Sequence, residues 1–132
     1  MPGIYNPNMR CPCCSGKDYA TCCEPFHQKL KFPKTAEELM RSRYAAFAIP
    51  NADYLMETTS PMQRKFHDKK EIEDWAKNNH WTKLEILSSS KSKVEFKAYF
   101  TDVEGKNHIH YEKSNFKYLN QRWYYHDGIF VD

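Results

Sequence analysis

The sequence predicts an α+β fold in which helices come first and an antiparallel sheet follows. Apolar residues recur at helical spacing soon after residue 35. Further along, Val94, Phe96, Ala98 and Phe100 alternate with polar residues, as in a half-buried strand. Turn residues separate this strand from two more strand-like segments. The order of these patterns predicts helices followed by an antiparallel meander.

Capping signals locate three helices in the first half of the chain. Thr35 followed by Glu38 is a capping box, and Pro50 stops the helix that it opens. Asn51 can cap a second, short helix, and Asp68 opens a third. The apolar stripe of the first helix consists of Leu39, Met40, Tyr44, Phe47 and Ala48.

The second half of the chain reads as strands joined by tight turns. Glu104-Gly105-Lys106-Asn107 has the composition of a hairpin turn, and Asn120-Gln121 turns the chain again. The strands predicted around these turns span residues 81–87, 94–100, 108–119 and 122–131.

Composition fits one compact domain with a small appendage. The chain has 132 residues, of which 40% are hydrophobic and 15% aromatic, enough apolar material for a core. The net charge of +3 is mild. It permits weak contact with RNA but lacks the strong basic bias of a dedicated nucleic-acid binder.

The chain contains no apolar run of about 20 residues, so no membrane span is expected. The first ten residues are polar and lack the apolar core of a secretory signal. These features predict a cytoplasmic protein, where thiols stay reduced and clustered cysteines indicate metal binding. Residues 1–34 are predicted to form a metal-binding module and linker, and residues 35–132 the main domain.

Four cysteines are predicted to bind one metal ion. Cys11 and Cys13 point the same way in an extended segment, and a Ser15-Gly16 turn brings the chain back to Cys22 and Cys23. Zinc takes four such ligands in a tetrahedron at roughly 2.3 Å from sulfur. The ion is predicted to be Zn²⁺, with iron as the alternative because thiolate sites accept both.

Other arrangements of the same residues stay open at this level. A disulfide between Cys22 and Cys23, or between Cys11 and Cys13, would close a very small strained ring, which disfavours such bonds. Cys14 is the surplus cysteine, and a free thiol beside the site is its favoured interpretation. His27 could replace one cysteine as the fourth ligand.

The pattern Cys-Pro-Cys-x-Ser-Gly-Lys-x-Tyr-x-x-Cys-Cys, residues 11–23, resembles the SEC-C motif, a zinc-binding module also found at the end of a translocation ATPase. The resemblance places the four cysteines on the ligand positions. The usual form of the SEC-C motif has glycine at the position of Cys14. SEC-C modules resemble docking elements, which implies a protein partner such as a translocation chaperone or the ribosome.

The remaining chain resembles the YchJ-like family of uncharacterised bacterial proteins. The segments that carry this resemblance are residues 39–47, 53–55 and 123–128. In that family the middle region is an NTF2-like (cystatin-like) cone, with N-terminal helices packed on a curved antiparallel sheet. The resemblance therefore implies such a cone preceded by a SEC-C-like zinc module. It also makes a homodimer plausible, since NTF2-like domains often pair through the sheet.

A pocket on the concave face of this sheet is a second candidate site. His110 and Glu112 share a face of one strand, and Tyr125 and Asp127 on the next strand would line the same pocket. A His–carboxylate pair there could act as general acid and base. The favoured alternative is a hydrogen-bonded polar sheet face, because no nucleophile or cofactor motif lies nearby.

These features predict a non-enzymatic zinc-binding protein that docks to a ribosome- or secretion-linked partner. The alternative is a small-molecule binding or catalytic NTF2-like domain. A weak RNA contact is a third hypothesis, although Trp123 and Tyr125 are expected in the core and not as a stacking platform for bases. Of Arg41 and Arg43, one is expected to pair with a carboxylate such as Asp53 and the other to be solvated.

Overall fold

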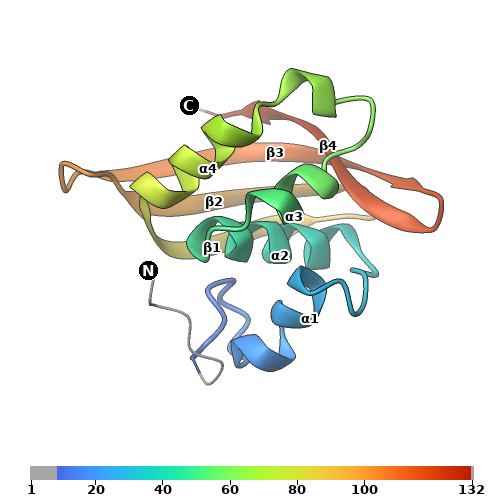
Figure 1. Cartoon of the computed structure of the whole chain (residues 1–132), viewed down its shortest axis with the longest axis horizontal. Helices are drawn as coiled ribbons and strands as arrows, with labels where there is room; N and C mark the ends of the chain where they lie inside the picture. The colour runs from blue at the N-terminus through green and yellow to red at the C-terminus, as the bar shows by residue number, and fades with distance from the viewer. Residues whose placement is uncertain (1–8, 132) are drawn as a thin grey trace.

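The computed structural model describes residues 9–131 and places three helices on one face of a four-stranded antiparallel sheet (Figure 1). The strands lie in the order β1-β2-β3-β4, which confirms the predicted meander. The elements are two 3-10 helices, η1 (Tyr19–Thr21) and η2 (Arg64–Phe66); four α-helices, α1 (Glu24–His27), α2 (Ala36–Ala48), α3 (Ala52–Glu57) and α4 (Lys69–Asn78); and four strands, β1 (His80–Ser89), β2 (Lys93–Thr101), β3 (Asn107–Leu119) and β4 (Arg122–Phe130). Among the helices of residues 9–131, none is long and apolar enough to cross a membrane.

Side-chain caps begin the three longer helices where the sequence indicated. The Thr35 hydroxyl accepts a hydrogen bond from the Glu38 backbone N–H at 3.0 Å, and Asn51 caps α3 in the same way. The Glu38 carboxylate accepts from the Lys34 N–H at 2.7 Å, one residue before the position of a capping box. Asp68 caps α4 through the Lys70 N–H.

Both predicted turns of the meander use backbone with positive φ. Gly105, at φ +84°, closes the loop between β2 and β3. Asn120 and Gln121 have φ values of +50° and +67°, as a two-residue type I′ hairpin requires. These turns set the register in which β2 pairs with β3 and β3 pairs with β4.

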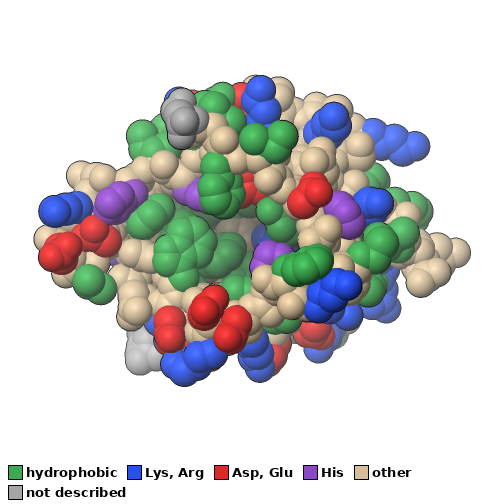
Figure 2. Space-filling model, turned by 90° about the horizontal axis from the view of Figure 1, so that it is seen from above, with side chains coloured by type: hydrophobic (Ala, Val, Ile, Leu, Met, Phe, Trp, Pro, Cys, Tyr) green, Lys and Arg blue, Asp and Glu red, His purple; other side chains and the backbone are tan. Residues whose placement is uncertain are grey.

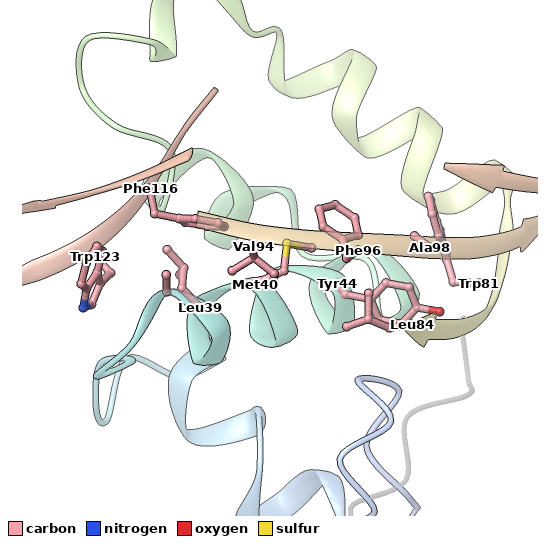
Figure 3. Close-up of a cluster of buried hydrophobic side chains, with 11 residues drawn as sticks. Leu39, Met40, Tyr44, Trp81, Leu84, Val94, Phe96, Ala98, Phe116 and Trp123 are labelled. Atoms are coloured by element: carbon pink, nitrogen blue, oxygen red, sulfur yellow. The ribbon is translucent and has the colours of Figure 1, made fainter. Parts of the chain in front are cut away.

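The main core lies between α2 and the sheet (Figure 3). From β2 it receives Val94, Phe96 and Ala98, the alternating residues of the sequence pattern. Helix α2 contributes Leu39 and Tyr44, both almost fully buried. This alternation buries one face of the sheet against the helices.

Helix α2 is covered on a second side by the N-terminal module, residues 9–27 (Figure 1). Ala45, which is fully buried, packs against the cysteine cluster, where its small side chain allows close approach. The His27 ring donates from Nε2 to the Ser42 carbonyl at 2.8 Å, and Arg41 Nη1 donates to the Cys13 carbonyl at 2.7 Å. Helix α2 therefore connects the two parts of the chain.

Candidate metal centre and sheet cavity

The N-terminal module is a short hairpin followed by two helical turns. Arg10 and Asp18 form an antiparallel bridge, and the Cys11 N–H donates to the Lys17 carbonyl at 2.8 Å. Gly16, at φ +86°, supplies the left-handed residue in the turn of this hairpin. The turn returns the chain so that the cysteine pair after η1 meets the pair before it.

The structure brings the sulfurs of Cys11, Cys13, Cys22 and Cys23 to within 4.8 Å of one another. A zinc ion held by four thiolates at about 2.3 Å would place sulfurs about 3.8 Å apart in a regular tetrahedron. The Sγ atoms of Cys13 and Cys22 are 3.6 Å apart, and those of Cys22 and Cys23 are 3.9 Å apart. All four cysteines are free thiols, so this geometry fits a metal ion and not disulfides.

The thiols influence one another's protonation. Hydrogen bonds from Cys11 and Cys23 hold the pKa of the Cys13 thiol far below its ordinary range. The hydrogen bond between Cys11 and Cys13 raises the pKa of the Cys11 thiol to about 12. Hydrogen bonds to Cys11 and Cys13 raise the pKa of the Cys23 thiol. Binding of a divalent cation must therefore displace thiol protons, which makes metal affinity depend on pH.

Cys14 lies outside the cluster and has a backbone role. Its φ of +66° is a left-handed conformation that favours glycine, which explains the glycine in the usual form of the motif. Its sulfur accepts the backbone N–H of Leu84 on β1 at 3.4 Å. Cys14 therefore joins the module to the edge strand of the sheet.

His27 does not replace a cysteine in the cluster. Its Nδ1 lies 2.6 Å from the Tyr19 hydroxyl, and its Nε2 contacts the Ser42 carbonyl. Burial lowers the pKa of the imidazole. Both ring nitrogens are engaged, so the alternative in which His27 serves as the fourth ligand is wrong.

The second candidate site is a cavity of about 350 Å³ between the helices and the sheet. Figure 2 looks onto a hollow around which hydrophobic side chains gather, with histidines beside it. The walls are mostly aromatic, with Phe47 from α2, Trp75 from α4, Trp81 from β1 and Phe130 from β4. Volumes of this size are typical of small-molecule sites.

Glu112 is the centre of a polar network in the cavity wall. This carboxylate is 5% exposed and accepts hydrogen bonds from His110 Nε2, the Ser114 hydroxyl and the Tyr125 hydroxyl, all at 2.7 to 2.8 Å. Burial opposes ionisation, but the three hydrogen bonds outweigh it and lower the pKa of Glu112. The cavity therefore contains an ionised carboxylate oriented entirely by protein donors.

Arg43 is the cavity's cation, and the sequence did not predict this. The guanidinium is buried beside the ring of Tyr125, 4.6 Å from its centroid. Its Nη1 donates to the Leu55 carbonyl at 2.9 Å and to the Thr58 hydroxyl at 2.7 Å. Arg41 pairs with the Glu37 carboxylate at 3.1 Å, as expected for one of the two arginines, although Asp53 itself pairs with Lys69. The expectation that the other arginine is solvated is wrong, since Arg43 is buried.

Asp127 is the one predicted pocket residue that lies elsewhere. Phe116 pairs with Tyr125 but Asn115 pairs with Asp127, so His126 is an extra residue that forms a bulge in β4. Beyond this bulge, the alternation of side chains between the two faces of the sheet is shifted by one residue. Asp127 is exposed and accepts a hydrogen bond from the Asn115 amide at 2.8 Å. The placement of Asp127 in the pocket is therefore wrong.

The bulge coincides with a contact from a distant segment. The Tyr125 N–H donates to the Thr58 carbonyl, and the Ser60 N–H donates to the Tyr125 carbonyl. The His126 ring lies 2.9 Å from the Ser60 hydroxyl. The residues of β4 alone do not predict hydrogen bonds with this segment.

Gly128 lies directly above the Glu112 side chain, and its replacement by alanine is expected to be disruptive. An added Cβ would come within 2.7 Å of the Glu112 carboxyl carbon. We expect Gly128→Ala to lower the free energy of unfolding by about 1–3 kcal/mol, as overpacking does. Urea unfolding followed by tryptophan fluorescence measures this. An unchanged midpoint would contradict the close packing of Glu112 under β4.

The lowered pKa of Glu112 gives a prediction for acid unfolding. A carboxyl whose pKa is depressed by folding stabilises the protein above its unfolded pKa and loses this contribution as the pH falls through its folded pKa. We expect the free energy of unfolding of the wild type to fall more steeply below about pH 4 than that of Glu112→Gln. Both proteins contain the same cysteines, so their difference isolates Glu112. Equal slopes in urea unfolding at pH 5 to 3 would contradict the assignment.

The fold and the cysteine cluster define an NTF2-like domain that carries a SEC-C motif. A sequence model of the SEC-C motif matches residues 8–25, and the model described as YchJ, middle NTF2-like domain, matches residues 35–128. The solution structure of a SEC-C motif containing protein from Rhodopseudomonas palustris is similar, with a TM-score of 0.84 and 38% identity over 94% of this chain and 100% of that one. A crystal structure of such a protein from Psychrobacter arcticus has a TM-score of 0.76 and 32% identity, over 96% and 85% of the two chains.

Curated relatives place the chain in a family. It is 47% identical over 124 residues to a UPF0225 protein of Actinobacillus succinogenes, which covers 89% of this chain and 80% of the relative. A UPF0225 protein of Haemophilus influenzae is 43% identical over 122 residues, 89% of this chain and 76% of the relative. The chain belongs to the UPF0225 (YchJ) family, as its motifs predicted.

Proposed function

We propose that this protein is a non-enzymatic zinc-binding adaptor of the cytoplasm. The observation that carries the proposal is that the four cysteine sulfurs lie within 4.8 Å of one another, with two of the separations, 3.6 and 3.9 Å, close to those of a tetrahedral zinc site. Four protein ligands fill the coordination of zinc and leave no position for a reacting water. The ion then has a structural role, and it holds a module too short to have a core of its own.

The docking part of the proposal draws on the SEC-C resemblance, which suggests a ribosome or a translocation chaperone as the partner. A polar groove of about 400 Å³ between the module and α2 supports it. The groove presents cations at Lys17, Lys31 and Arg41 and acids at Glu37 and Glu38. Groups of both signs around a rigid metal-bound turn suit a protein surface with complementary charges.

Binding to purified partners tests the adaptor role. We expect the protein to co-sediment with purified bacterial ribosomes or to bind a purified translocation chaperone in a pull-down. The double variant Cys22→Ser, Cys23→Ser should lose this binding, and Cys14→Ser should retain it. Binding that survives removal of the metal would show that the metal-binding module has only a structural role and does not contact the partner. Absence of binding to either partner would contradict the adaptor role.

The sheet cavity favours a second candidate function, the binding of a small molecule. A filled, apolar sheet face would have excluded this function, whereas the structure has a cavity of about 350 Å³ with an arginine and a His–Glu pair in its wall. Aromatic walls and a few fixed polar groups are the usual composition of a small-molecule site. Saturable binding of a fluorescent aromatic probe, with one site per chain, would support it.

A further inference from the structure

The polar groups of the sheet cavity lie close together in its wall and leave specific hydrogen-bonding positions unused. Arg43, His110 and Glu112 all line the cavity. Tyr125 connects them, because its hydroxyl bonds Glu112 and its ring lies against Arg43. The hydrogen bonds that these side chains already make determine what a ligand has to supply.

Arg43 offers hydrogen-bond donors. The side chain is 8% exposed, and the hydrogen bonds that it makes within residues 9–131 all come from Nη1. Its Nε and Nη2 groups have no such partner within those residues, and the guanidinium stays protonated. A ligand oxygen that accepts hydrogen bonds therefore matches this position.

His110 offers an acceptor. Glu112 takes three donors and, as an ionised carboxylate, cannot donate, so the His110 nitrogen that faces it, Nε2, carries the proton. In the neutral ring Nδ1 is then an acceptor, and within residues 9–131 it has no hydrogen-bond partner. The ring is held between aromatic side chains, 5.9 Å from Trp75 and 4.9 Å from Phe130 between centroids. A ligand hydroxyl matches this nitrogen.

Charge and shape restrict the ligand further. The cavity already contains one buried cation, Arg43, and one buried anion, Glu112, which offset each other. An additional charge would be desolvated without a partner of its own, so a neutral ligand is favoured. The aromatic walls favour a planar ring system, which stacks or meets them edge to face.

We propose that the cavity binds a neutral, planar hydroxy-aromatic carbonyl compound, whose hydroxyl donates to His110 Nδ1 and whose carbonyl oxygen accepts from Arg43. This inference rests on the second proposed function, that the cavity binds a small molecule. It adds the chemical class of the ligand and the two residues that select it.

Three fluorescent naphthalenes test the assignment with the whole 132-residue chain in its metal-loaded form. The probe 6-acetyl-2-naphthol has both polar groups, 2-acetylnaphthalene lacks the hydroxyl, and 2-naphthol lacks the carbonyl. We expect one equivalent of 6-acetyl-2-naphthol to bind, and each missing group to weaken binding about tenfold, as the loss of one hydrogen bond does.

The variant His110→Phe keeps an aromatic ring and removes the acceptor. It should weaken binding of 6-acetyl-2-naphthol about tenfold and leave 2-acetylnaphthalene unaffected. His108→Phe is the matched control, because His108 lies two residues earlier on β3, is exposed, and contacts Asp102 at 2.7 Å. It should bind all three probes like the wild type.

The outcomes separate the inference from the function on which it rests. Equal affinity for the three probes, with His110→Phe indistinguishable from His108→Phe, would overturn the ligand class while the cavity still binds small molecules. If no probe binds saturably to the wild type, both the ligand class and the binding function are wrong. Ile72→Trp, which fills the cavity from α4, should abolish binding; unchanged binding would place the probes elsewhere and overturn the inference.

Discussion

Replacing Cys23 with serine is expected to reduce the bound metal from about one ion per chain to near zero. Cys23 is 1% exposed, and its sulfur lies 3.9 Å from that of Cys22. Serine puts a hydroxyl in place of this buried thiol, so the substitution removes one of the four sulfur ligands. Structural zinc supplies roughly 10–16 kcal/mol in small zinc-binding peptides, and this module has little core of its own. We expect its backbone amides to lose protection from hydrogen exchange, while the sheet stays folded because the sheet-side core contains no module residue.

Cys14→Ser is the matched control for this experiment. Cys14 neighbours Cys13 in sequence but lies outside the cluster of four sulfurs. Its replacement should leave the metal content unchanged and affect only the contacts of its sulfur with the Leu84 N–H and the Pro12 carbonyl. Elemental analysis of both purified variants measures the difference. Equal metal content in the two variants would contradict the assignment of Cys23 as a ligand.

Replacing Arg43 with methionine is expected to lower the free energy of unfolding by about 3 kcal/mol. The substitution preserves most of the apolar stem but removes the donors to the Leu55 carbonyl and to the Thr58 hydroxyl. It also removes the cation that balances the buried charge of Glu112. Arg43→Lys should recover only part of the loss, since lysine lacks the planar fork.

Arg122→Met provides the control for Arg43. Arg122 is exposed, and its guanidinium lies 3.8 Å from the ring centroid of Phe32. A contact of this kind at the surface is worth about 0.5–1 kcal/mol. Urea unfolding of the metal-loaded proteins should therefore separate the two variants by about 2 kcal/mol. Similar losses for both would contradict a buried structural role for Arg43.

The sequence predicted those features that depend on near neighbours. Thr35 and Asn51 cap helices because the amides that they bond follow three residues later. Alternation along β2 identified Val94, Phe96 and Ala98 as core residues because β2 has no bulge of its own: its pairing with β3 is regular, and the extra residues at the two register shifts against β1 lie in β1. The cysteine spacing is equally local, and the structure brings those four sulfurs together.

The sequence failed where partners come from distant segments. Asp127 changes face because Thr58 and Ser60, over 60 residues earlier, bond the backbone of Tyr125 beside the bulge. Arg43 was expected either to pair with a carboxylate or to be solvated, although the sequence contained a signal for its burial. It follows Met40 by three residues and precedes Phe47 by four, the spacing of the helix face that packs on the sheet.

X-ray absorption spectroscopy at the zinc edge of the purified protein tests most directly whether four cysteines bind one structural ion. We predict four sulfur neighbours at about 2.3 Å and no nitrogen or oxygen ligand. The spectrum should be the same for Cys14→Ser. A first shell containing nitrogen or oxygen, or a protein that contains no zinc under reducing conditions, would contradict the account.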